Sequence, residues 1–346
     1  DSNSQAVLLT NEKNIGYFCG FFHSEGYLLV TENETVLFVD FRYYEAALKK
    51  SSGCRVVCFT KLFKDLISEL KNNSAVNVFF EASDITVEKY NRFKKAFSEN
   101  NIECVCDGSR VHKIEEIRCI KDESEIKKIA KAQEITEKSY LEVLNYLKPG
   151  VSERRVALEL EHLIKLNGGD GVSFDLITIT GKKTSLPHGV PSDDIVSEGD
   201  FFTFDIGSIF DGYHSDTTRT VAIKSADEEM KKVYDIVLKA QLAVLDSVKP
   251  GAKCSDVDKI ARDIISENGY GKYFGHATGH GVGLDIHESP VVSPRSETIL
   301  KKGMIITDEP GIYLPGKFGV RIEDMLCVTD TGYKNFVSLP KELIIV

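Results

Sequence analysis

The segment from His276 to Glu288 combines histidine, glycine and acidic residues in a pattern suited to chemistry, reading HATGHGVGLDIHE. Three of the chain's eight histidines lie in it, at positions 276, 280 and 287. Imidazole serves readily as a metal ligand and as a proton carrier near neutral pH. Glycines at 279, 281 and 283 allow the backbone to approach a ligand closely. A lone histidine is more often a core residue, but three on such a segment predict a functional site if acidic partners exist elsewhere.

Two aspartates between residues 201 and 221 are the first such partners. Asp211-Gly212 is typical of a type I′ hairpin turn, which would place position 205 opposite position 218. Asp205 and Asp216 would then be diagonal neighbours on one face, because side chains alternate faces along a strand. Asp205 interrupts an apolar run, where an unpaired carboxylate is costly or becomes protonated. We therefore expect a cation beside it.

Two glutamates form a second acidic pair. Glu309 and Glu323 are expected on paired strands joined by a loop rich in proline and glycine. The adjacent Asp308 and Asp324 should face the other way, solvated or hydrogen-bonded to backbone.

The four carboxylates and one imidazole carry too much negative charge for one structural zinc, which favours sulfur and nitrogen ligands. Oxygen-rich sites favour harder ions such as manganese. Two divalent cations would balance the four acids, and such pairs, about 3.5–4 Å apart, activate water and polarise a carbonyl. The pattern predicts hydrolytic chemistry.

The last two thirds of the chain contain an internal repeat. A helix is expected over 122–147, with Asp122 and Glu125 as a capping box. The Lys-Pro-Gly that ends it at 148–150 returns at 249–251, and Asn-Gly at 167–168 returns at 268–269. Gly199 and Gly303 each precede an apolar run that ends in an acid. The repeat predicts two α+β halves related by pseudo-symmetry, with matching acids facing each other between them.

The first third reads as a separate α/β domain. Short strands are expected at 6–9, 27–30, 35–40, 55–60, 75–81 and 102–106. Helices are expected at 61–72 and 84–100, the latter capped by Asp84. His23 and His112 stand alone and are interpreted as structural or surface residues. We place the domain boundary near residue 115.

Composition excludes several classes of function. With 43 basic and 53 acidic residues, a net charge of −10, the chain is a poor candidate for nucleic-acid or anionic-membrane binding. Its eight cysteines show no CxxC spacing, which favours reduced, mostly buried thiols. No apolar run reaches the roughly 20 residues of a membrane helix, and no signal peptide is evident. We expect a cytoplasmic protein.

Together these motifs resemble those of the pita-bread metallopeptidases, in the branch of Xaa-Pro dipeptidase (prolidase) and aminopeptidase P. The resemblance covers essentially the whole chain. It rests on FDIG with SDTTRT, HxTGHGVG with HESP, EPG, and RIED. It implies a creatinase-like N-terminal α/β domain, 1–115, and an α+β pseudo-symmetric pita-bread (creatinase/aminopeptidase-like) catalytic domain, 116–346. It also implies cleavage before proline in small proline-containing peptides, and a homodimer.

The resemblance further implies a role for each site residue. Two divalent ions, Mn²⁺ in first place with Co²⁺ or Zn²⁺ as alternatives, would be held by Asp205, Asp216, His280, Glu309 and Glu323, with Asp216 and Glu323 bridging. Glu309 would also handle the proton of the nucleophile, His287 would steady the tetrahedral intermediate, and His188 would contact substrate. His276 and Arg321 would face the substrate or support the ligands. Asp308 and His214 are unusual for the family at their positions.

Several alternatives stay open at this point. The chain length favours a prolidase over an aminopeptidase P, which releases the first residue of longer Xaa-Pro peptides. The choice depends on whether a group such as Arg295 or Arg321 caps the proline carboxylate. A methionine aminopeptidase, a creatinase-type amidinohydrolase and a catalytically inactive pita-bread peptide-binding module share parts of the pattern. The last of these should have lost the metal ligands.

Overall fold

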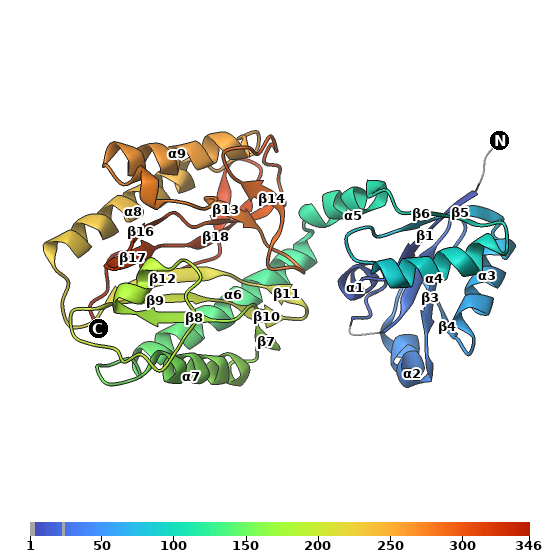
Figure 1. Ribbon diagram of the computed structural model, residues 1–346, viewed down its shortest axis with the longest axis horizontal. Coiled ribbons are helices and arrows are strands. Elements are labelled where there is room, and N and C mark those ends of the chain that lie inside the picture. The colour runs from blue at the N-terminus through green and yellow to red at the C-terminus, as the bar shows by residue number, and fades with distance from the viewer. Residues whose placement is uncertain (1–3, 23–24) are drawn as a thin grey trace. The chain divides into compact units, whose positions relative to one another are not determined.

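The computed structural model describes residues 4–22 and 25–346, which form two compact units, Asp1–Ile117 and Arg118–Val346 (Figure 1). The prediction for His23 lies outside the described residues. His112 is exposed and pairs with Glu115, as expected of a surface residue. All eight cysteines are free, four of them buried and four half-buried. Within the described part of the chain, no helix is both long and apolar enough to cross a membrane.

The first unit is built on a mixed six-stranded sheet. The strands are arranged in the order β4-β3-β2-β1-β5-β6, and the pairs β1–β2 and β2–β3 are antiparallel. Their bounds are Ser4–Leu9 (β1), Tyr27–Val30 (β2), Thr35–Val39 (β3), Arg55–Cys58 (β4), Ala75–Phe80 (β5) and Glu103–Val105 (β6). Each predicted strand is therefore present, with shifts of one or two residues at most ends.

Helices cover both faces of this sheet. They are α1 (Glu12–Cys19), α2 (Phe41–Lys50), α3 (Leu62–Asn72), α4 (Val87–Ser98) and α5 (Ser109–Cys119). Separate apolar cores pack α3 and α4 on one face and α1 and α2 on the other. The predicted cap of α4 was wrong. Thr86 caps the helix by accepting from the Lys89 N–H, whereas Asp84 accepts hydrogen bonds from Thr10 and Asn11.

The second unit contains the predicted pseudo-symmetric halves. Its helices are α6 (Glu123–Leu144), α7 (Glu153–Leu166), α8 (Glu228–Ser247) and α9 (Cys254–Glu267). The first-half strands are β7 (Gly171–Val172), β8 (Ile177–Thr180), β9 (Phe201–Ile206), β10 (Ser208–Phe210), β11 (Tyr213–His214) and β12 (Thr217–Ala222). The second-half strands are β13 (Gly279–Gly281), β14 (Glu288–Val292), β15 (Ile305–Asp308), β16 (Gly311–Leu314), β17 (Phe318–Arg321), β18 (Asp324–Val328) and β19 (Tyr333–Asn335).

The repeat extends to the backbone conformation. Gly150 and Gly251, which end the Lys-Pro-Gly motifs, have φ values of 91° and 89°. Gly168 and Gly269 follow α7 and α9 with φ of 98° and 86°, a conformation that favours glycine. The green helices α6 and α7 lie against the strands of the first half, and the orange helices α8 and α9 lie against those of the second (Figure 1). The predicted capping box of Asp122 and Glu125 is confirmed at the start of α6.

Candidate metal centre

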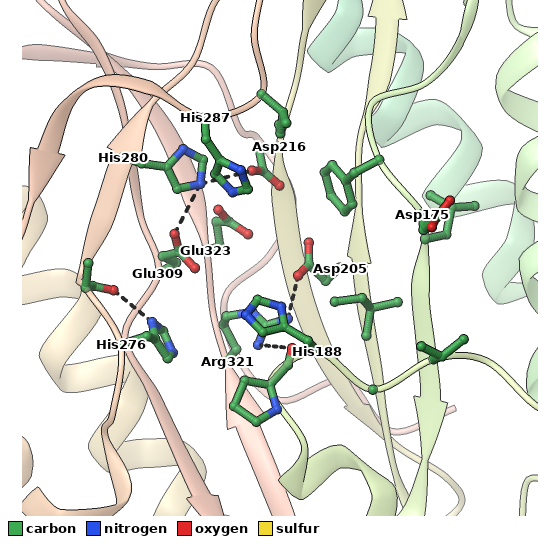
Figure 2. Close-up of a pocket in the computed structure, with 18 of the residues that line it drawn as sticks. Asp175, His188, Asp205, Asp216, His276, His280, His287, Glu309, Arg321 and Glu323 are labelled. Carbon is green, nitrogen blue, oxygen red and sulfur yellow. Dashed lines mark hydrogen bonds and ion pairs between the residues drawn. The ribbon is translucent and has the colours of Figure 1, made fainter. Parts of the chain in front are cut away.

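A cavity of about 450 Å³ opens between the strands of the two halves of the second unit (Figure 2). This volume suits a small peptide. Both halves contribute to its lining, which includes every site residue predicted from the sequence: His188, Asp205, Asp216, His276, His280, His287, Glu309, Arg321 and Glu323. The remaining lining is largely apolar and includes Phe174, Leu176, Ile177 and Ile286.

The two aspartates are placed by the hairpin of the first half. Asp211 and Gly212 both have positive φ, 48° and 81°, as a type I′ turn requires. Asp205 on β9 pairs with Thr218 on β12, the predicted register, and Asp216 directly precedes β12. Both carboxylates therefore reach the cavity from the same side (Figure 2).

The two glutamates lie just outside the paired strands β15 and β18, rather than within them as predicted. Asp308 pairs with Asp324, so Glu309 and Glu323 each lie one residue beyond that last pair. The ladder stops here because the next residue, Pro310, has no N–H to donate. The chain between the glutamates forms the hairpin β16–β17 instead of the expected loop.

His280 comes from β13, where the flanking glycines permit close packing of neighbouring strands. A Cβ atom on Gly279 would lie 2.0 Å from the carbonyl oxygen of Thr307, and one on Gly281 would lie 2.3 Å from that of Ser289. The His280 Nδ1 atom lies 3.1 Å from the carbonyl oxygen of Gly281. Donation from Nδ1 leaves Nε2 free to act as a ligand on the side facing the acids.

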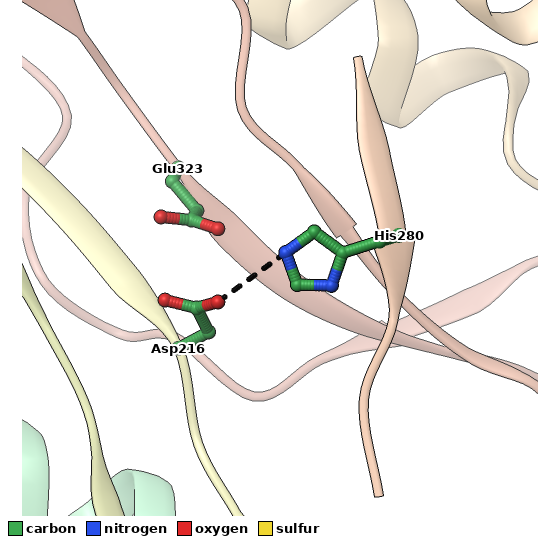
Figure 3. Close-up of side chains that lie close together, drawn as sticks. All are labelled: Asp216, His280 and Glu323. Atoms are coloured by element: carbon green, nitrogen blue, oxygen red, sulfur yellow. Dashed lines mark ion pairs between the residues drawn. The ribbon is translucent and has the colours of Figure 1, made fainter. Parts of the chain in front are cut away.

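Asp216, Glu323 and His280 converge at short range (Figure 3). The potential ligand atoms of Asp216, His280 and Glu323 all lie within 4.8 Å of one another. His280 Nε2 is 3.5 Å from Asp216 Oδ2 and 3.4 Å from Glu309 Oε1. Thr218 donates a hydrogen bond of 2.6 Å to Glu323 Oε2. Asp216 Oδ1 and Glu323 Oε1 are buried without a hydrogen-bond partner among the described residues.

Burial and mutual repulsion disfavour the ionised form of these acids in the absence of a cation. Loss of solvent raises the pKa of Asp216 and of Glu323 well above the usual range, and the neighbouring acids add to the effect. Burial raises the pKa of Glu309 to about 8. Burial also lowers the pKa of His280, which favours the neutral imidazole needed for metal binding. The donor set therefore fits divalent cations, which would balance the charge that remains after the one protein cation in the group, Arg321, has paired with Asp205.

Arg321 supports the acids instead of projecting freely into the cavity. Its guanidinium pairs with Asp205 at 2.5 Å and donates to the Tyr313 hydroxyl at 2.7 Å. The same hydroxyl lies 2.8 Å from His276 Nε2. Burial lowers the pKa of His276 to about 4. Sequence reasoning missed Tyr313, because nothing distinguishes it from the apolar residues around it in β16.

The remaining predicted residues lie at the cavity wall. His287 is exposed, and its ring centroid is 4.4 Å from that of His280. His188 lies in the segment after the 3₁₀ helix Gly181–Ser185 and is exposed. Arg295, one proposed cap for a substrate carboxylate, is exposed and does not line the cavity.

Asp308 and Asp324 face away from the cavity as predicted, since neither lines it, but the prediction that they are solvated or hydrogen-bonded to backbone was wrong, because both are fully buried and Asp324 is held by side chains. Asp324 accepts from Arg219 at 2.8 Å and Asn335 at 2.6 Å, and pairs with Lys341 at 2.8 Å. Arg219 lies 105 positions away in the sequence, so spacing alone could not reveal this ion pair. Neither carboxylate oxygen of Asp308 has a hydrogen-bond partner in the described part of the chain.

Comparison with known proteins gives relatives over nearly the whole chain. Residues 127–330 match metallopeptidase family M24, and residues 1–120 match the Creatinase/Prolidase N-terminal domain. The Xaa-Pro dipeptidase of Pyrococcus furiosus is 39% identical over 346 residues, covering 99% of this chain and 97% of that protein.

Solved structures agree with these matches. The Xaa-Pro dipeptidase from Bacillus anthracis superposes with a TM-score of 0.95 at 39% identity, covering 99% of this chain and 95% of that one. The X-Pro aminopeptidase from Thermotoga maritima gives a TM-score of 0.93 at 33% identity, covering 99% and 98%. The predicted two-part creatinase and pita-bread architecture is confirmed. The chain therefore belongs to metallopeptidase family M24, with a creatinase/prolidase-type domain ahead of its peptidase domain.

Proposed function

We propose that this metallopeptidase is a Xaa-Pro dipeptidase that hydrolyses the bond before proline in small peptides. One observation carries the proposal: four carboxylates and one imidazole line a peptide-sized cavity, and two carboxylate oxygens there are buried without a hydrogen-bond partner in the described part of the chain. We assign Asp205, Asp216, His280, Glu309 and Glu323 as ligands of two divalent ions, Mn²⁺ first, with Co²⁺ or Zn²⁺ as alternatives. Relatives named Xaa-Pro dipeptidase, similar over the full chain, support the substrate class.

The bound cations would supply a Lewis acid for the scissile carbonyl and lower the pKa of a water molecule. Glu309 would accept the proton of that water as its oxygen attacks the carbonyl carbon. As the C–N bond breaks, Glu309 would return the proton to the proline nitrogen. His287 would donate a hydrogen bond to the developing oxyanion, and His188 would position the substrate.

The Xaa-Pro bond suits this machinery. It is a tertiary amide, so its nitrogen has no hydrogen for a peptidase to recognise. A site that polarises the carbonyl and protonates the leaving nitrogen does not need an N–H group in the scissile bond. We also propose that the chain acts as a cytoplasmic homodimer, and light scattering coupled to size-exclusion chromatography would test the dimer.

A second candidate function is that of an Xaa-Pro aminopeptidase acting on longer peptides. Dipeptidase specificity calls for a cation that binds the free proline carboxylate. Arg321 already contacts Asp205, Tyr313 and Thr218, and Arg295 does not line the cavity. Among the described lining residues, a free guanidinium or ammonium group is therefore not found. The lack of such a cation speaks for the aminopeptidase candidate, whose substrates carry no free carboxylate on proline. An inactive peptide-binding module is disfavoured because the ligand set is complete.

Substrate length and metal dependence test both candidates. The metal-depleted protein should be inactive, and added Mn²⁺ or Co²⁺ should restore cleavage of an Xaa-Pro dipeptide such as Met-Pro. Similar kcat/KM for Met-Pro and Met-Pro-Ala would support the aminopeptidase candidate, whereas a strong preference for Met-Pro would support the dipeptidase. Failure to cleave either peptide with either metal would overturn the proposed function.

A further inference from the structure

We propose that Glu288 is a positioning residue that holds His287 toward the cavity. The proposal rests on the function proposed above, in which His287 contacts the reacting carbonyl. Glu288 is the first residue of β14 and directly follows His287. Its carboxylate is largely buried, with a side chain 11% exposed, and does not line the cavity.

Two cations from the segment before α6 bind this one carboxylate. Lys121 Nζ lies 2.5 Å from Glu288 Oε1, and Arg118 Nη2 lies 2.9 Å from Glu288 Oε2. The Lys121 side chain is 1% exposed and that of Arg118 is 10% exposed. Arg118 also pairs with Asp285 at 2.6 Å, and the Asp285 side chain is 40% exposed. Because the Glu288, Lys121 and Arg118 side chains are shielded from solvent, their attraction is stronger than that of a surface ion pair.

The loop between β13 and β14 folds around this carboxylate. A Cβ atom on Gly283 would lie 2.4 Å from Glu288 Oε1, so glycine leaves the space that the carboxylate occupies. The Gly283 carbonyl accepts from the His214 N–H at 2.9 Å, which ties the loop to the first half of the unit. The Asp285 N–H points toward Glu288 Oε2 at 3.4 Å. The loop that carries His287 is therefore fixed at both ends.

The backbone link between Glu288 and His287 transmits this anchoring. His287 is the last residue of the bend that directly precedes β14, so the two residues share one peptide unit. The Glu288 carboxylate is held by Arg118 and Lys121, whereas the His287 side chain lines the cavity. Loss of the anchor would let the segment rotate, and misplacement of about 1 Å can lower a rate about 100-fold.

A double-mutant cycle between Glu288→Gln and His287→Ala tests the proposal. E288Q keeps the side-chain shape but removes the charge, and we expect kcat for an Xaa-Pro substrate to fall about 10-fold or more with KM and metal content unchanged. In the H287A background, E288Q should cause no further fall. An equal fall in both backgrounds would overturn the proposal, because Glu288 would then act independently of His287.

A second variant and an NMR measurement test the role of Glu288 even if E288Q misfolds or the protein does not cleave Xaa-Pro bonds. Lys121→Met removes one cation without altering the loop and should show the same dependence on His287. The imidazole ¹H–¹³C signal of His287, assigned by its loss in H287A, should shift in E288Q and K121M whether or not the protein cleaves Xaa-Pro. Glu297→Gln is the matched control, since Glu297 is 82% exposed and pairs with Lys253. An unmoved His287 signal in both E288Q and K121M would overturn the proposal.

Discussion

Two groups of buried acids lie within a few residues of each other in this protein, and they differ in how their charge is balanced. Asp324 is surrounded by protein partners, namely Arg219, Lys341 and Asn335. Its neighbour Glu323 faces the cavity with other acids and has a buried oxygen without a described partner. Burial of an acid is therefore not the signal of a site in this fold. The signal is burial without a matching protein cation, which is what a metal-binding site requires.

The largest effect should follow from changing the cavity acids whose negative charge is not matched by protein cations, which we call the unbalanced group: Asp216, Glu309 and Glu323. Asp216→Asn or Glu323→Gln should abolish turnover, by more than the roughly 100-fold seen when outer partners of a metal are lost. The reason is that each neutral amide removes a charge that the cations need. Metal content and kcat/KM measured on the same preparation check this. Wild-type activity in either variant would refute the ligand assignment.

His287 should matter for rate but not for metal binding. His287→Ala should lower kcat about 100-fold, the scale of a positioned proton or hydrogen-bond donor, while elemental analysis finds the wild-type metal content. Kinetics like those of the wild-type protein would reject the role of this histidine. A lower metal content in the His287→Ala variant would instead mean that His287 helps to bind the metal ions.

Asp324 and its partners Arg219, Lys341 and Asn335, which we call the balanced group, should contribute mainly to the free energy of unfolding. Asp324→Asn breaks a buried ion pair and leaves Arg219 without its carboxylate, so we expect about 3–5 kcal/mol less free energy of unfolding. Urea unfolding of the metal-free protein gives this quantity directly. Metal binding by the folded fraction should persist. A change below 1 kcal/mol, taken as about the average for point mutants, would show that the two groups do not differ in this way.

The unbalanced group should make the metal-free protein sensitive to pH. Glu309 has its pKa raised from 4.5 to about 8 by burial, so the folded state keeps a proton that the unfolded state loses. The free energy of unfolding should therefore fall as pH rises from about 4.5 to about 8. Metal should stabilise the protein more at the upper end of this window, because it replaces the missing proton. Thermal unfolding with and without Mn²⁺ at both ends of the window checks the sign.

The smallest effect should come from Asp308, which lies between the two groups. Burial raises its pKa well above the usual range, and Asp324 and Glu309 add to the shift, so the folded protein favours the neutral form. Asp308→Asn keeps that neutral charge, and we expect a change of about 1 kcal/mol or less. Unfolding curves compared with those of Asp324→Asn show whether the contrast holds. A loss as large as that of Asp324→Asn would mean that Asp308 is ionised.

Sequence patterns predicted much of the fold and most of the functional residues that line the cavity. The repeat of Lys-Pro-Gly and Asn-Gly predicted the two halves because the same local geometry recurs, with matching positive φ. The hairpin turn fixed the register of Asp205 because one tight turn determines every pair that follows. The histidine-rich segment and the acids that line the cavity with it were recognised from their spacing.

Other features depend on contacts between distant segments and left no local signal. Tyr313 joins His276 to Arg321 from a strand that reads as apolar. Asp324 is balanced by Arg219, 105 positions away in the sequence. Thr86 and Asp84 are both good helix caps by type, and the hydrogen bonds from Thr10 and Asn11 to Asp84 decided between them.

The two-metal site is tested most directly by counting the divalent ions bound per chain. Inductively coupled plasma mass spectrometry after dialysis against Mn²⁺ gives this number. Two ions in the wild-type protein and at most one in Glu323→Gln would support five side chains holding a pair of cations. Equal metal content in the two proteins would contradict it, because the buried Oε1 atom of Glu323, which has no hydrogen-bond partner among the described residues, would then have no part in binding.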